Sequence, residues 1–149
     1  MTSSSQIKSW MSNEWSFVGV FKASKLSSMG NIFEINNASI IVNIQEGKLS
    51  GHFVALFLSE SYCLYFDSLG KKKINYCLQH FLKKKYKIII MNNLKLQSSE
   101  SSNCAKFSVL FCKQVRNIKT YRKFLKTFHK KSLISNDWII DLIFNKSLP

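Results

Sequence analysis

The stretch that decides the fold is residues 51–70, Gly-His-Phe-Val-Ala-Leu-Phe-Leu-Ser-Glu-Ser-Tyr-Cys-Leu-Tyr-Phe-Asp-Ser-Leu-Gly. Two apolar runs, His52–Leu58 and Tyr62–Phe66, are joined by a short polar link, Ser-Glu-Ser. Short apolar runs rich in aromatic and β-branched residues, separated by such a link, are typical of a β-hairpin. In a hairpin the start of the first strand lies beside the end of the second. The sequence therefore predicts that His52 and Asp67 are neighbours.

Outside this hairpin the sequence predicts further strands and amphipathic helices. Short runs rich in Ile, Val and aromatic residues are typical of strands, and apolar residues spaced three or four positions apart are typical of helices. The expected strands are residues 15–21, 38–44 and 87–91, and the expected helices run from 74 to about 84–86, from 104 to about 115, from 119 to 130 and from 137 to 145. Ser135 or Asn136 is the expected cap of the last helix. This order predicts an α+β fold in which helices flank a mostly antiparallel central sheet.

Length and composition favour a single domain over residues 1–149. The hydrophobic content is 46% and the aromatic content 13%, which is enough to bury a core. No apolar run is long enough to cross a bilayer, and the N-terminus lacks the pattern of a secretory signal. The four cysteines form no Cys-x-x-Cys pair, so we expect reduced thiols, an intracellular location and no metal site. Cys63 and Cys77 are expected to lie in the core.

Positive charge is concentrated in the second half of the chain, mainly in two basic stretches, residues 71–87 and 113–131. Residues 1–67 carry four lysines and five acids, whereas residues 68–149 carry 18 Lys and Arg and three acids. A field of this strength attracts polyanions such as nucleic acid. A solvated lysine-rich surface, encoded by an A+T-rich genome, is an equally weighted alternative. The candidate nucleic-acid contacts are Lys71, Lys72, Lys73, Lys83, Lys84, Lys85, Arg116, Lys119, Arg122 and Lys123.

Cys104 follows a polar loop and opens an apolar run, Cys-Ala-Lys-Phe-Ser-Val-Leu-Phe-Cys, that predicts a helix. A helix N-terminus presents free backbone N–H groups and a positive dipole end, which favour the nucleophilic thiolate. His52 as a base and Asp67 as the group that orients it would complete a nucleophilic site. Taken one at a time, each residue has a structural alternative: a buried unreactive cysteine, a structural histidine, and an Asx turn at the end of a strand.

Gln97 is the fourth candidate residue. It lies seven positions before Cys104, and the intervening residues, Ser-Ser-Glu-Ser-Ser-Asn, form a polar loop that can bring its amide over the thiol. Acyl transfer needs hydrogen-bond donors aimed at the developing oxyanion. The Gln97 amide and the backbone N–H of Cys104 are the expected donors.

In the order His, Asp, Gln, Cys, these motifs resemble those of the adenovirus-type endopeptidases (adenains), with the SUMO-specific proteases as distant relatives. The six residues between Gln97 and Cys104 fit adenains better than SUMO proteases, which usually have one fewer. The similarity covers roughly residues 15–115 and rests on Trp-Ser-Phe-Val-Gly-Val-Phe at 15–21, Gly-His-Phe-Val-Ala at 51–55 and Cys-Leu-Tyr-Phe-Asp-Ser-Leu-Gly at 63–70.

The resemblance implies a papain-like, adenain-type cysteine protease fold and a role for each residue. His52 would act as general base and then as general acid, and Asp67 would orient it. Cys104 would attack the peptide carbonyl. Gln97, with the backbone N–H of Cys104, would form the oxyanion hole.

Two positions depart from the family pattern. Phe53 stands where the family usually has Trp after the histidine, so an aromatic ring is kept but the indole donor is lost. Ala105 stands where Gly usually follows the cysteine; alanine is small and a good helix former, so we expect activity to survive, but the cleft would be narrowed if the glycine is needed for close approach of the substrate. An inactive homologue is therefore an open alternative.

The resemblance also implies a biological setting. The protein would be a cysteine endopeptidase of a virus or mobile element that processes structural or capsid precursors, often beside small residues such as glycine. Adenains are activated by DNA and by a short substrate-derived peptide, so these are the implied cofactors, with no small-molecule cofactor. The implied partners are precursor proteins and nucleic acid but no membrane, the implied location is the host nucleus or the virion, and the chain is expected to be a monomer. The alternatives are a protease against SUMO or ubiquitin and a DNA-binding protein with a vestigial catalytic set.

Overall fold

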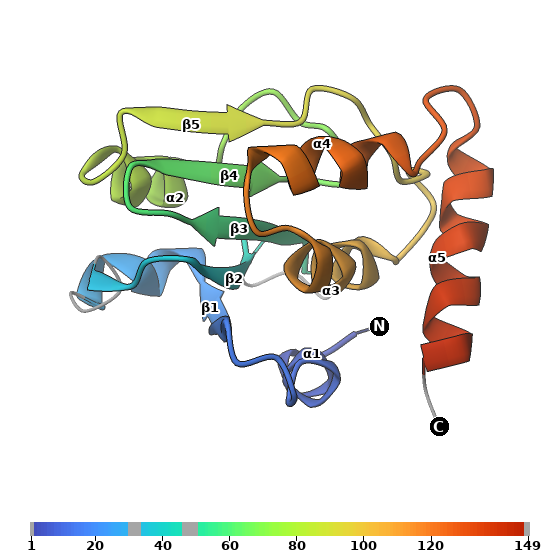
Figure 1. The fold of residues 1–149 in the computed structure, drawn as a ribbon, viewed down its shortest axis with the longest axis horizontal. Coiled ribbons are helices and arrows are strands. Elements are labelled where there is room, and N and C mark those ends of the chain that lie inside the picture. The colour runs from blue at the N-terminus through green and yellow to red at the C-terminus, as the bar shows by residue number, and fades with distance from the viewer. Residues whose placement is uncertain (1, 30–33, 46–50, 148–149) are drawn as a thin grey trace.

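The computed structural model describes residues 2–29, 34–45 and 51–147, and it confirms the α+β class (Figure 1). In chain order its elements are α1 (Ser4–Trp10), β1 (Phe17–Lys22), the 3-10 helix η1 (Ala23–Ser28), β2 (Ala38–Asn43), β3 (Phe53–Leu58), β4 (Tyr62–Phe66), α2 (Tyr76–Lys83), β5 (Ile88–Met91), α3 (Cys104–Gln114), α4 (Ile118–Lys126) and α5 (Leu133–Ser147). Within these ranges, no helix combines the length and the apolar character that a membrane span requires.

The five strands form one sheet in the order β1-β2-β3-β4-β5. The two inner pairings, β2 with β3 and β3 with β4, are antiparallel, but the two outer pairings are parallel. The sheet is therefore mixed, and the expectation of a mostly antiparallel sheet was wrong in this respect. The cause lies in the connections, because a chain segment that crosses over the sheet returns the next strand in the same direction. The β4–β5 connection contains α2, and the β1–β2 connection contains η1.

The central hairpin is the one that residues 51–70 predict. Strands β3 and β4 pair antiparallel, with Leu58 opposite Cys63 and Ala55 opposite Phe66. The polar link is closed by Ser59, whose N–H donates to the carbonyl of Tyr62 at 3.0 Å. Its hydroxyl accepts the N–H of Tyr62 at 3.0 Å in return. The link thereby sets the register that aligns the two open ends of the hairpin.

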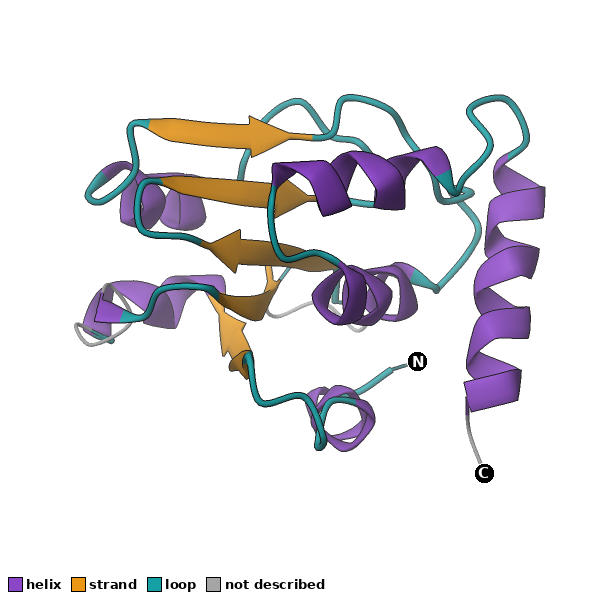
Figure 2. Ribbon diagram, viewed as in Figure 1, coloured by secondary structure: helices purple, strands orange, loops and turns teal. Residues whose placement is uncertain are grey.

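Helices cover both faces of the sheet (Figure 2). Alternate side chains of a strand point to opposite faces. Accordingly, residues 53, 55 and 57 of β3 pack with α1, α3, α4 and α5, whereas residues 54, 56 and 58 pack with α2 and η1. All six residues of β3 are buried, which explains why its sequence is a continuous apolar run.

An aromatic cluster fastens β4 to α3 and α4. The ring of Phe66 stacks on that of Phe111 with centroids 5.5 Å apart, and meets Phe124 edge-on at 5.0 Å. Phe124 in turn meets Phe128 edge-on at 5.3 Å. Pairs of this kind contribute about 0.5–1.5 kcal/mol each beyond their burial. The cluster holds the helix that begins at Cys104 against the sheet.

The observed helices differ from the expected ones in several places. The sequence pattern did not reveal α1, and α4 ends at Lys126 rather than at Lys130. Helix α5 begins at Leu133, so Asn136 lies inside it and does not cap it. The fully buried side chain of Asn136 instead bonds both the N–H and the carbonyl of His129, each at 2.6 Å. Local propensity predicted that Asn136 caps a helix, but in the fold its side chain bonds backbone groups outside that helix.

We predict that Gly70→Ala destabilises the fold. Gly70 has φ +63°, and an added Cβ would lie 2.6 Å from the carbonyl carbon of Leu94 and from the backbone nitrogen of Lys95. The left-handed conformation alone costs a residue with a side chain about 1–2 kcal/mol, and the backbone collision adds to that. Urea unfolding followed by circular dichroism measures the loss.

Gly51→Ala is the matched control for this prediction. There the obstacle is the amide end of the Asn43 side chain, which is able to shift. The loss should be clearly smaller than at Gly70. Equal losses in the two variants would contradict the interpretation of the Gly70 turn.

Candidate active site

Two of the candidate residues meet at the open end of the hairpin. His52 immediately precedes β3 and Asp67 immediately follows β4, so antiparallel pairing brings them together. The Nε2 atom of His52 lies 2.7 Å from Oδ1 of Asp67. Both residues are buried, with 4% and 1% of their surfaces exposed. The predicted proximity of this pair is confirmed.

The turn after β4 and one amide hold Asp67 in place. The N–H of Leu69 donates to Oδ1 of Asp67 at 2.9 Å. Asn92, just beyond β5, accepts the N–H of Asp67 at 2.9 Å and donates to its carbonyl at 2.6 Å. Sequence reasoning missed Asn92. The available signal was a polar residue directly after a strand, at the same edge of the sheet as Asp67.

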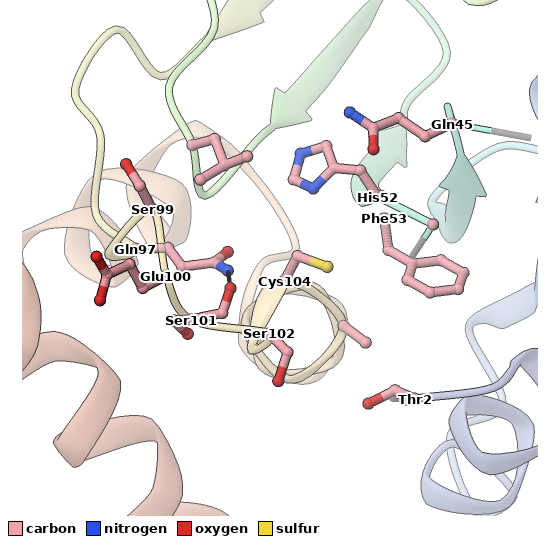
Figure 3. Close-up of a pocket in the computed structure, with 13 residues that line it drawn as sticks. Thr2, Gln45, His52, Phe53, Gln97, Ser99, Glu100, Ser101, Ser102 and Cys104 are labelled. Carbon is pink, nitrogen blue, oxygen red and sulfur yellow. Dashed lines mark hydrogen bonds between the residues drawn. The ribbon is translucent and has the colours of Figure 1, made fainter. Parts of the chain in front are cut away.

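Cys104 reaches the histidine from the first turn of α3. Figure 3 shows its sulfur and the ring of His52 at the same cavity, and Cys104 is near enough to help raise the pKa of the histidine. Because Nε2 of His52 is bonded to Asp67, Nδ1 is the ring nitrogen left for the sulfur. Helix α3 is also tied to β3, since Ser108 Oγ donates to the carbonyl of Phe53 at 3.3 Å. The imidazole is therefore bonded to a carboxylate and shares its cavity with a thiol.

The electrostatics of the site favour a protonated imidazole. Burial by itself lowers the pKa of His52. The hydrogen bonds with Asp67 and Cys104, together with the negative charges of these groups, outweigh burial and raise the pKa to about 9. An imidazolium held between two acidic groups is suited to stabilise a thiolate.

Gln97 lies in the same cavity, with its amide fixed from both ends. Its Oε1 accepts the hydroxyl of Ser68 at 2.5 Å, and its Nε2 donates to the carbonyl of Ser101 at 2.7 Å (Figure 3). A primary amide has two N–H groups, so one remains for a ligand in the cavity. Ser68, a second residue that sequence reasoning missed, sets the orientation of the amide by donating to its oxygen.

His52, Gln97 and Cys104 line a cavity of about 340 Å³. Thr2, from the segment before α1, lies across the cavity from Gln97 (Figure 3). The two positions that depart from the adenain pattern, Phe53 and Ala105, are also in the lining. Cys104 itself is 8% exposed and borders this cavity.

The remaining thiols are not part of the site. Cys63 and Cys112 are buried, and burial raises the pKa of both, to about 12 for Cys112. Cys77 is exposed on α2, so its expected place in the core was wrong. Among the described residues, no group of three or more His, Cys, Asp and Glu side chains is placed to hold a metal ion.

The candidate nucleic-acid contacts do not form one surface. Lys119, Arg122 and Lys123 are exposed on α4, on the α3 side of the sheet. They line a groove of about 530 Å³ together with Ile118 and Lys126. Lys83 and its neighbours end α2, which covers the opposite face. The two basic stretches are thus divided between the two faces of the molecule.

Arg116 has a different role from the other cations. Its guanidinium donates to the carbonyls of Cys112 and Val115 at 2.6 and 2.9 Å, where α3 ends. It also pairs with Glu14 at 3.3 Å, which ties this helix end to the segment before β1. A cation at a helix C-terminus is favourable to the helix dipole. These interactions engage Arg116 within the fold.

No protein-family model matches this chain, and no curated protein sequence matches it. Solved structures do. Two crystal structures of the ASFV pS273R protease, one of them with selenomethionine, align with 89% of this chain at TM-scores of 0.53 and 0.52 and 14% identity. AvrA, solved as a deletion variant with IP6 and CoA, aligns with 89% of the chain at a TM-score of 0.50 and 15% identity. The chain spans 62–63% of the length of the first protein and 53% of the second. It therefore shares the α+β fold of papain-like cysteine proteases.

We predict that stability falls as pH rises from about 6.5 to about 9. The folded protein keeps the His52 proton up to the raised pKa, whereas the unfolded chain loses it near 6.5, so the contribution is complete below 6.5 and is lost as pH passes 9. The loss is on the order of 3 kcal/mol. Urea unfolding of the wild type and of His52→Gln across this range isolates the effect. Parallel pH curves for the two proteins would contradict it.

Proposed function

We propose that this chain is a cysteine endopeptidase in which His52, Asp67, Cys104 and Gln97 carry the reaction. The observation that carries the proposal is the position of one buried imidazole, which is bonded to Asp67 at 2.7 Å and lines the same cavity as Cys104. A nucleophile, a base and a group that orients the base are the parts that covalent acyl transfer needs. The open cavity beside them gives room for a peptide backbone.

The first half of the reaction forms an acyl-enzyme. The Cys104 thiolate attacks the peptide carbonyl carbon, and a C–S bond forms. The second N–H of the Gln97 amide and the backbone N–H of Cys104 stabilise the oxyanion. The imidazolium of His52 then donates its proton to the leaving amine, and the C–N bond breaks. Asp67 keeps the ring oriented and stabilises its positive charge.

The second half returns the enzyme to its starting state. His52, now neutral, takes a proton from water as the water attacks the thioester carbon. The tetrahedral intermediate collapses, the C–S bond breaks and the carboxylic acid product leaves. Cys104 is again a thiolate beside a protonated His52.

The substrates that we propose are structural or capsid precursors of a virus or mobile element, cut next to small residues such as glycine. This proposal is supported by the adenain-like motifs and by the fold shared with the ASFV pS273R protease. We further propose stimulation by DNA, which the net charge of +14 supports. The resemblance adds an activating peptide, a monomeric state and action in the host nucleus or virion.

Two other functions use the same features differently. A protease against SUMO or ubiquitin would apply the same chemistry to a Gly-Gly terminus, and it would release the modifier from a conjugate while sparing capsid precursors. A DNA-binding protein with a vestigial site would bind DNA without reacting with thiol probes. The shared cavity of His52 and Cys104, together with the raised pKa of His52, favours an enzyme over the vestigial alternative.

We predict that Cys104→Ala and His52→Ala each lower peptide hydrolysis by a factor on the order of 10⁴ or more, because both act on the reacting atoms. Gln97→Ala should cost about 10²–10³ in rate. Asp67→Asn should cost less than loss of the nucleophile. The measurement is cleavage of candidate precursor proteins, with circular dichroism to confirm that each variant folds.

Probe labelling supplies the control for these variants. A peptide vinyl sulfone should modify Cys104, as located by mass spectrometry, and should fail in His52→Ala. Cys77→Ser is the matched control, since it removes the exposed thiol without touching the cavity. Near-normal hydrolysis in Cys104→Ala would refute the assignment.

We predict that duplex DNA stimulates cleavage, and that the stimulation falls steeply with salt because binding to phosphates releases counterions. Replacing Lys119, Arg122 and Lys123 with Ala should reduce the slope of log affinity against log salt by about 0.9 for each phosphate that is no longer neutralised. The Lys71, Lys72 and Lys73 triple variant tests the other basic stretch. Cleavage that responds to neither DNA nor salt would make the charge irrelevant to activity.

A further inference from the structure

Helix α5 supplies hydrogen bonds to the loop that carries the proposed oxyanion donor. Figure 1 shows α5 standing across the end of the sheet where β4 and β5 finish. The loop between Leu96 and Cys104 runs past this helix. Two consecutive residues of α5, Asn136 and Asp137, bond to it.

Asn136 anchors the start of the loop. Its Nδ2 donates to the carbonyl of Leu96 at 3.0 Å, while its own position is fixed by the backbone of His129. Leu96 and Gln97 both donate their N–H groups to the carbonyl of Ser68, at 2.8 and 3.0 Å. The loop therefore leaves the sheet in a defined direction.

Asp137 binds the rest of the loop at three points. Its Oδ2 accepts the N–H of Ser98 at 2.9 Å. Its Oδ1 accepts the hydroxyl of Ser101 and, at 3.2 Å, the side-chain amide of Asn103. None of the ion pairs among the described residues includes Asp137. The three donors that bond this carboxylate are neutral groups of one loop. Hydrogen bonds to an ionised acceptor are charge-assisted and stronger than bonds between neutral groups.

These bonds lead directly to Gln97. Ser101 donates its hydroxyl to Asp137 and accepts a bond at its carbonyl from Nε2 of Gln97 at 2.7 Å. The latter bond uses one N–H of the amide and orients the other. Asn103 is the residue before Cys104, and its side chain bonds Asp137 in place of capping α3. Asp137 therefore bonds Ser98, the residue after Gln97, and Asn103, the residue before Cys104, but it bonds no reacting atom.

We propose that Asp137 is a positioning residue that holds Gln97 and the first turn of α3 in the geometry that stabilises the oxyanion. The inference rests on the proposed function, and it assigns to α5 a part in the chemistry that sequence reasoning did not foresee. Displacing a donor by about 1 Å costs up to about 100-fold in rate.

The test compares two reactions of Cys104 in a Cys77→Ser background, which removes the exposed thiol. Acylation by p-nitrophenyl acetate passes through an oxyanion, whereas alkylation by iodoacetamide does not. Asp137→Asn and Asp137→Ala should slow acylation by about 10–100-fold and change alkylation by less than about twofold. Ser101→Ala should slow acylation by less, because the two other bonds to Asp137 remain.

Asp141→Asn is the matched control. Asp141 lies one turn further along α5 and pairs with Lys106 at 3.0 Å, and none of the hydrogen bonds found among the described residues joins it to the loop. Both rates should stay near those of the parent protein. Adding Asp137→Asn to Gln97→Ala should cause a smaller loss of acylation than Asp137→Asn causes alone, because the part of the effect that passes through Gln97 is already absent.

An unchanged acylation rate in Asp137→Asn, or an equal fall in both reactions, would overturn the inference. If Asp137→Ala does not fold, Asp137→Asn and Ser101→Ala decide the question by the same two rates. A parent protein that is acylated at Cys104 but cleaves no protein substrate would overturn the endopeptidase proposal and leave the role of Asp137 standing. A parent protein without acylation at Cys104 would overturn both.

Discussion

The packing of α3 against β3 sets the distance between Cys104 and His52, and the rest of the site depends on it. The nucleophile opens the helix and the base precedes the strand, so neither side chain is carried by a free loop. The hydroxyl of Ser108 donates to the carbonyl of Phe53 between the two elements, and the aromatic cluster around Phe111 holds α3 against β4, the strand beside β3. Side chains on packed elements lose little freedom when they react, which is the physical basis of preorganisation.

Much of this arrangement could be predicted because its signals are local. The hairpin follows from two apolar runs and a polar link, and the proximity of His52 and Asp67 follows from the hairpin. The helix at Cys104 follows from apolar periodicity. Each of these conclusions needs only neighbouring residues and the geometry of one supersecondary unit.

The parts that could not be predicted depend on interactions between distant segments. The parallel pairing of β4 with β5 arises from the path of the chain over the sheet, which leaves no mark in either strand. The bonds that Asn92, Ser68 and Asp137 make to the site join residues far apart in the sequence, so no local pattern indicates them. Asn136 was mistaken for a helix cap because its partners, Leu96 and His129, lie outside its helix. The charge pattern likewise indicated one basic half, whereas the fold sends its two stretches to opposite faces.

The close approach at Gly70 has a consequence for how such a chain can diverge. With no side chain at this position, the turn that follows Asp67 lies against the backbone of Leu94 and Lys95. The turn after Asp67 and the segment after β5 that leads to Gln97 therefore cross with their backbones in close contact. Insertions and deletions are tolerated where backbone is exposed, so evolutionary drift in length should gather at the exposed tip, Ser99 and Glu100, and spare the crossing itself.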